Sequence, residues 1–179
     1  MNLPFNEAKA TQAAGLILQL RGGTMNFMKL IKLLYLADRE ALLQWGRPVT
    51  TDRWVSMDHG PVVSRIYSLI SDEPPPQSDS VWRNHIQRTA YDVTLIEPVS
   101  DDELSTAELK LLRQIFGLYG RKYRWHLVDY CHTLPEWKHP EGSSLPITIA
   151  DILRGAGRSE QEVEAITDEI DNLALVHRM

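Results

Sequence analysis

Apolar residues recur along most of this chain at the three- and four-residue spacing of a helix with one buried face. The pattern predicts helices over residues 6–21, 26–45, 106–119, 123–132, 148–154 and 160–176. Two capping boxes, at 105–108 and 159–162, mark helix starts because their side chains satisfy free backbone N–H groups. Helix 26–45 is apolar on nearly every face, which predicts a place in the middle of a domain.

Shorter segments alternate polar and apolar residues and predict strands. One strand is expected over 53–57, and two more, over 81–88 and 91–97, are expected to form a hairpin. Pro61 is predicted to start a helix, because its missing N–H would be unpaired at that position anyway. A surface loop is expected over 74–80. The fold class is therefore mostly α (α+β), a single helix-rich domain over 1–179 with a small antiparallel β element and C-terminal helices within 148–176.

Composition supports a folded intracellular protein. The chain has 179 residues, 43% hydrophobic and 24% charged, which argues against wholesale disorder. Cys131 is the single cysteine, so no intramolecular disulfide can form. The N-terminus lacks the pattern of a secretory signal, and the densest apolar stretch, 30–37, is far shorter than the ~20 residues that span a bilayer. We therefore expect a cytoplasmic protein with no membrane segment.

The net charge of −5 arises entirely in residues 81–179, which hold 11 Lys and Arg against 16 Asp and Glu. This balance argues against broad contact with a phosphate backbone and makes a nucleic-acid partner the less favoured one. The helix pair over 106–132 nevertheless has the outline of a helix-turn-helix, with Arg121, Lys122 and Arg124 near its turn. A DNA-binding transcriptional regulator using 106–132 is therefore the alternative function.

No complete catalytic or metal site is visible in the sequence. His126, His132 and His139 are six and seven residues apart, which is not the spacing of a metal pair on a helix. Cys131 and His132 are adjacent, and neighbours on a helix point about 100° apart. No glycine-rich phosphate loop occurs. We therefore expect neither enzymatic activity nor a cofactor nor a metal, with a small hydrolase built on the histidines as a third hypothesis.

The segment 58–61, Asp-His-Gly-Pro, allows two interpretations. A Gly-Pro pair at a helix start presents free backbone N–H groups, which can bind an acidic group. In the simpler interpretation, glycine supplies a positive φ for a turn and proline starts the helix. The physical argument favours the turn.

Several motifs in order resemble a known family. A Lys-Leu-x-Tyr helix at 32–35 is followed by a Gly-x-Pro-x-Thr turn at 46–50, an aromatic strand with Trp54, and Gly-Pro-Val at 60–62. A later loop at 132–137 contains His132, Glu136 and Trp137. Over about residues 10–140 the chain resembles the Panacea domain, the SocA-like antitoxin family of bacterial and phage toxin–antitoxin systems.

The resemblance implies a helix-rich fold with a small β element, and an antitoxin that neutralises a cognate toxin by direct protein–protein binding. It brings no catalytic residue and no cofactor, and homo-oligomerisation stays open. We take the family motifs and the side chains near them as hypothetical toxin contacts, although the tryptophans are equally consistent with core positions. These hypothetical contacts are Trp54, Asp58, His59, Gly60, Pro61, Arg65, His132, Glu136 and Trp137.

Overall fold

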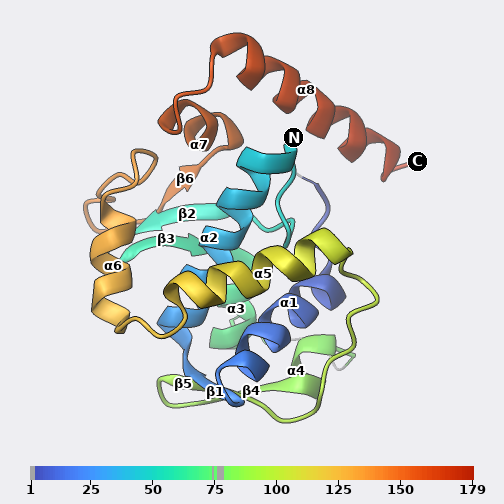
Figure 1. Cartoon of the computed structure of the whole chain (residues 1–179), viewed down its shortest axis with the longest axis vertical. Coiled ribbons are helices and arrows are strands. Elements are labelled where there is room, and N and C mark those ends of the chain that lie inside the picture. The colour runs from blue at the N-terminus through green and yellow to red at the C-terminus, as the bar shows by residue number, and fades with distance from the viewer. Residues whose placement is uncertain (1–2, 74, 76–78) are drawn as a thin grey trace.

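A computed structural model of the chain describes residues 3–73, 75 and 79–179, so most of the expected loop over 74–80 lies outside the described residues. The helix α2 (Phe27–Trp45) runs through the middle of the molecule, with the other elements around it (Figure 1). The Asn26 side chain accepts the backbone N–H groups of Met28 and Lys29 at its start, and Gly46, with φ of 73°, ends it. The predicted central helix is thus confirmed.

Two long helices pack against α2 and against each other: α1 (Glu7–Leu20) and α5 (Thr106–Tyr119). Ala10, Ala13 and Ala14 of α1 are fully buried, and such small side chains permit close helix packing. The capping box at Ser105 and Glu108 starts α5 as predicted. The shorter α6 (Arg124–His132) follows and packs against α2.

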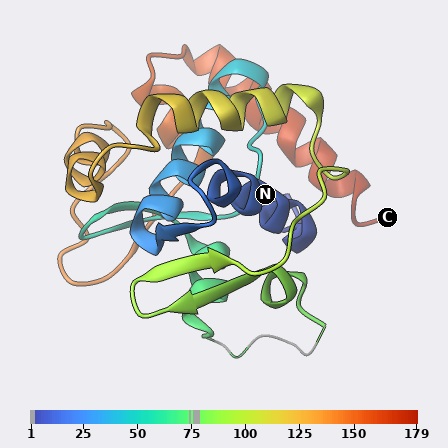
Figure 2. The same cartoon turned by 60° about the horizontal axis from the view of Figure 1, so that its bottom comes forward.

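One antiparallel sheet, which Figure 2 brings forward, has the order β1-β5-β4, from β1 (Thr24–Asn26), β5 (Asp92–Leu95) and β4 (Ile86–Thr89). The predicted hairpin exists, but the expected strand over 81–88 is wrong in its first half, which is the helix α4 (Val81–His85). Glu7 of α1 accepts hydrogen bonds from the Ser80 hydroxyl and the Trp82 backbone N–H, and Trp82 is buried. These contacts with α1, which is distant in the sequence, favour a helical turn over 81–85 in place of the expected strand.

A second antiparallel sheet has the order β3-β2-β6, formed by β3 (Gly60–Val63), β2 (Trp54–Met57) and β6 (Leu145–Ile147). The predicted helix start at Pro61 is wrong: Pro61 pairs with Ser56 in the sheet, and α3 (Ser64–Ser71) begins three residues later. The Asp52 carboxylate accepts the backbone N–H groups of Arg65 and Ile66, and so caps α3 from outside the helix. The pairing of Pro61 in the sheet and the cap from Asp52 therefore place the start of α3 at Ser64.

The chain ends with α7 (Ile149–Gly155) and α8 (Glu160–Val176), which confirms the two predicted C-terminal helices. The second predicted capping box, at Ser159 and Glu162, starts α8. Val163, Ile170 and Ala174 form the buried side of α8, which lies across one end of the molecule (Figure 1). The fold is mostly helical α+β as predicted, and no helix in the described part of the chain has the length and hydrophobicity to cross a membrane.

Candidate functional site

Polar side chains of the central helix α2 hold the surrounding segments in place. Lys32 is 1% exposed, and its ammonium group donates a 2.8 Å hydrogen bond to the carbonyl of Pro61. Gly60 has φ of +106°, and a Cβ on it would lie 3.1 Å from Lys32 Nζ and 3.3 Å from Cys131 Cβ. The Gly-Pro motif therefore lets β3 approach α2 and α6 closely, which a side chain at Gly60 would prevent.

Burial lowers the pKa of Lys32 to about 8. Above pH 8 the unfolded chain therefore still binds a proton at this lysine that the folded protein has released. The free energy of unfolding should therefore rise above pH 8, and Lys32 should contribute up to about 1.4 kcal/mol per pH unit to this rise. We expect Lys32→Met to remove this contribution when unfolding by urea is compared at pH 8 and pH 9. Equal pH slopes in the two proteins would refute the assignment.

Asp38 connects α2 to the turn before β2. Its carboxylate accepts hydrogen bonds from the Thr50 N–H at 2.8 Å, the Thr50 hydroxyl at 2.5 Å and the indole N–H of Trp54 at 3.0 Å. Complete burial raises the pKa of Asp38 to about 6, although these hydrogen bonds act in the opposite direction. Trp54 is only 5% exposed, so it offers a partner almost no surface and belongs to the core.

Glu136 anchors the loop that follows α6. Its fully buried carboxylate accepts the Tyr35 hydroxyl at 2.8 Å and pairs with Arg39 Nε at 2.6 Å. Burial, together with the Glu136 charge, raises the pKa of Tyr35, so its hydroxyl stays protonated and donates. The two α2 side chains thus pull the loop against the helix, and Glu136 is a buried anchor rather than an exposed contact.

The same loop is fastened to the β2–β3 turn. His132 Nε2 donates to the carbonyl of Asp58 at 3.0 Å, and the indole N–H of Trp137 donates to the carbonyl of Met57 at 2.9 Å. The rings of His132 and Trp137 stack with centroids 4.1 Å apart. On the other side of the turn, the His59 ring meets the Trp125 ring edge-on at 5.3 Å. Turn, loop and α6 therefore form one continuous surface.

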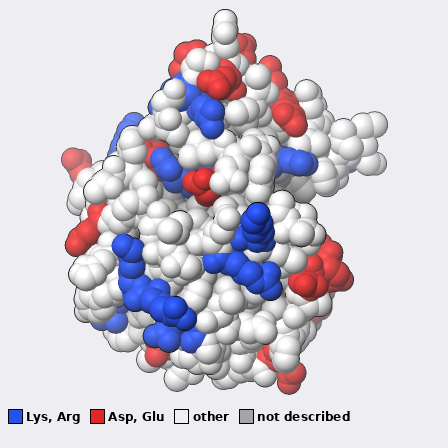
Figure 3. Space-filling view, viewed as in Figure 1, with Lys and Arg blue, Asp and Glu red and all other residues white. Residues whose placement is uncertain are grey.

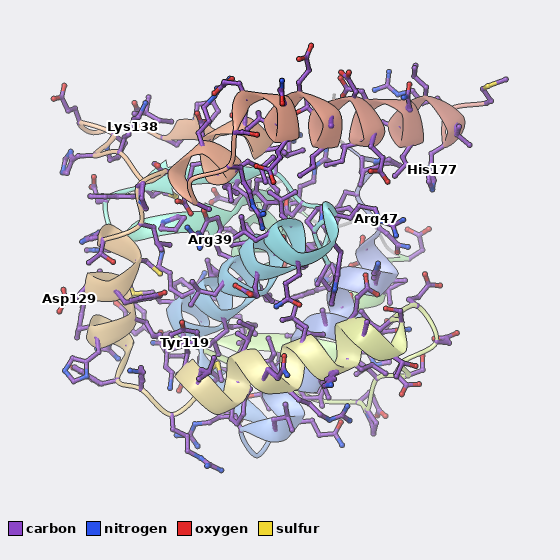
Figure 4. The ribbon with its side chains drawn as sticks, turned by 45° about the horizontal axis from the view of Figure 1, so that its top comes forward. Arg39, Arg47, Tyr119, Asp129, Lys138 and His177 are labelled. Atoms are coloured by element: carbon purple, nitrogen blue, oxygen red, sulfur yellow. The ribbon has the colours of Figure 1, made fainter. Side chains whose placement is uncertain are left out.

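This surface, which we term the aromatic face, concentrates exposed rings. Tyr123 is 56% exposed, Tyr130 39% and Trp125 37%, all in or next to α6. Tyr130 stacks on Tyr119, and Tyr123 contacts His126 edge-on. In Figure 4, Tyr119, Asp129 and Lys138 mark this edge of the molecule, and His177 lies on the opposite side. The aromatic face comprises His59, Tyr119, Tyr123, Trp125, His126, Tyr130, His132 and Trp137.

The structure separates the nine predicted contacts into three groups. Four lie on the aromatic face or at its border, namely Asp58, His59, His132 and Trp137. Four are buried: Gly60, Pro61 and Glu136 lie beneath the aromatic face, and Trp54 lies at the end of the β2–β3 hairpin away from the turn. Arg65 is exposed on α3, beyond the other end of the β2–β3 hairpin, with its guanidinium 5.9 Å from the centre of the Phe5 ring.

The exposed rings in and next to α6 are not among the nine residues predicted from the sequence. The run Tyr123-Arg124-Trp125 is the sequence signal for them, because aromatic and Arg residues side by side are typical of binding surfaces.

In the described part of the chain, no three His, Cys, Asp or Glu side chains are placed to hold a metal ion. Burial raises the pKa of Cys131 to about 11, which keeps its thiol protonated at neutral pH.

Exposed aromatic rings over buried hydrogen-bonded anchors, on a helix-rich α+β fold, are typical of a binding surface. Residues 30–138 match the family described as Antitoxin SocA-like, Panacea domain, and the chain belongs to that family. Membership supports an antitoxin-type role in general. The match begins in α2 and ends after Trp137, so it contains the whole aromatic face and its buried anchors. No curated protein and no solved structure matches the chain.

Proposed function

We propose that this chain is the antitoxin of a bacterial or phage toxin–antitoxin system, acting in the cytoplasm. It neutralises its cognate toxin by direct protein contact through the aromatic face. The observation that carries the proposal is the concentration of exposed Tyr, Trp and His rings on one surface inside the family's matched region. Rings of this kind bury a large area at low entropic cost and dominate binding hot spots.

The anchoring beneath the face supports the same function. Lys32, Glu136 and the indole of Trp137 fix the β2–β3 turn and the loop after α6 to the helical core. A surface that is already ordered before binding loses less conformational entropy when the partner arrives. The proposal assigns no catalytic step and no cofactor: occupation of the toxin surface is the inhibitory act.

The direct test is co-expression with the toxic product of the neighbouring gene. We expect growth to be rescued by the chain, and the two proteins to co-purify as a complex. A variant with alanine at Tyr123, Trp125 and Tyr130 should fold normally and fail to rescue. If the wild-type chain neither rescues growth nor co-purifies, the proposed function is wrong for this protein.

A further inference from the structure

Beside the aromatic face, four segments of the chain bring basic side chains together. Lys110 and Arg113 are exposed on α5, Arg121 and Lys122 follow its end, and Arg124 begins α6. Arg21, which follows α1, lies near this group. Lys29 donates a 2.8 Å hydrogen bond to the carbonyl of Gly120, and the positive charge of Arg21 helps to lower the pKa of Lys29. We call this group the basic strip: Arg21, Lys110, Arg113, Arg121, Lys122 and Arg124.

Among the residues that the structure describes, the basic strip takes part in no ion pair. The ion pairs of the described residues join Lys9 to Glu108, Arg39 to Glu136, and two arginines, at 154 and 158, to glutamates of α8. None of these pairs includes a residue of the strip. Figure 3 shows Lys and Arg in two neighbouring groups, one over α5 and one toward the start of α6, with Asp and Glu mostly toward the edge of the molecule and on α8. In a chain of net charge −5, this surface is a local positive field.

The basic strip and the aromatic face are continuous. The Arg124 guanidinium lies 5.8 Å from the centre of the Tyr123 ring and 5.6 Å from that of the Trp125 ring. A partner that covers Trp125 therefore also comes within reach of Arg124 and its basic neighbours. A cation stacked on aromatic rings is held in place, and so needs less ordering when it meets an anionic group.

We propose that the surface of the toxin that covers the aromatic face is acidic along one side, where it meets the basic strip. This inference rests on the proposed function. The carboxylates of Asp58 and Asp129 lie exposed beside and on the aromatic face, and Asp101, Asp102 and Glu103 precede α5. These charges repel a phosphate backbone that continues past the strip in either direction.

The dimensions agree with a protein partner. The helix α5 has 14 residues and is therefore about 21 Å long. A standard protein interface covers about 800 Å² on each partner. Charges at the border of such an interface mainly accelerate association and select the partner.

The test uses the full chain and the toxic product of the neighbouring gene, with association followed by stopped-flow fluorescence. Raising salt from about 0.05 M to 0.5 M should lower the association rate constant on the order of tenfold. The double variant Arg121→Glu with Lys122→Glu should lower it to a similar extent at low salt. A matched control, Glu164→Lys with Glu169→Lys on the exposed side of α8, should not lower it.

The outcomes separate the two proposals. A complex that forms at a rate independent of salt and of the Arg121 and Lys122 reversals overturns the acidic-partner inference and leaves the proposed function standing. Absence of any complex overturns both. The same proteins are titrated with duplex DNA from the chain's own promoter. Binding to DNA that the reversals abolish, with no toxin binding, assigns the strip to nucleic acid instead.

Discussion

Replacing Glu136 with alanine is expected to lower the free energy of unfolding by about 3–5 kcal/mol, the usual cost of removing one partner of a buried ion pair. Glu136 is fully buried and serves both Arg39 and Tyr35, from two successive turns of α2. The substitution leaves the guanidinium of Arg39 largely buried without its counter-charge, and the buried Tyr35 hydroxyl without an acceptor.

Urea unfolding followed by tryptophan fluorescence measures this loss. Glu169→Ala is the matched control, because it removes the same charge from an exposed position on α8 and should change stability by no more than about 0.5 kcal/mol. A loss below about 1 kcal/mol for Glu136→Ala would show that the network does not hold the loop.

The second large effect concerns affinity. Trp125→Ala is expected to weaken binding of the toxin by about 2–4 kcal/mol, roughly 30- to 1,000-fold in Kd. Trp125 is the ring that joins α6 to the β2–β3 turn through His59, and it also supports Arg124. Its removal takes away an exposed ring of the aromatic face while the buried anchors remain. Isothermal titration with the purified toxin measures the change.

Trp45→Ala provides a close control for this experiment. Trp45 ends α2 and is 38% exposed, against 37% for Trp125, but it lies outside the aromatic face. Its replacement should change Kd by less than about twofold. Equal losses for the two variants, or no loss for either, would place the interface elsewhere. Circular dichroism of both variants verifies that the fold is retained.

Local sequence signals predicted the helical part of the fold well. Helices α1, α5 and α8 each combine a regular apolar face with a capping residue at the start, and α2 combines a dense apolar run with one. Both signals are readable without tertiary information. The strand β3 was missed because Pro61 suits a first helical position as well as a strand. Only pairing with β2 decides between them, and that pairing is non-local.

The candidate site was predictable in part. The family motifs pointed to His132 and Trp137, and His59 was predicted as a neighbour of the Gly-Pro motif. The structure places all three on one surface. A core position was one of the two expectations for Trp54, but its hydrogen bond to Asp38 and the buried role of Glu136 were not predictable, because their partners on α2 are distant in the sequence. A glutamate is rarely fully buried unless it is paired, so its exposure was the natural expectation.

The central claim is that the aromatic face is the surface that binds the toxin. Hydrogen exchange of backbone amides, compared between the free chain and its toxin complex, tests this directly. We expect slower exchange in the complex within the β2–β3 turn at 57–60, the connection at 120–124 and the loop at 133–139. Exchange in β4, β5 and α8 should remain unchanged. Protection confined to those last three elements, with none at the turn or the loop, would contradict the claim.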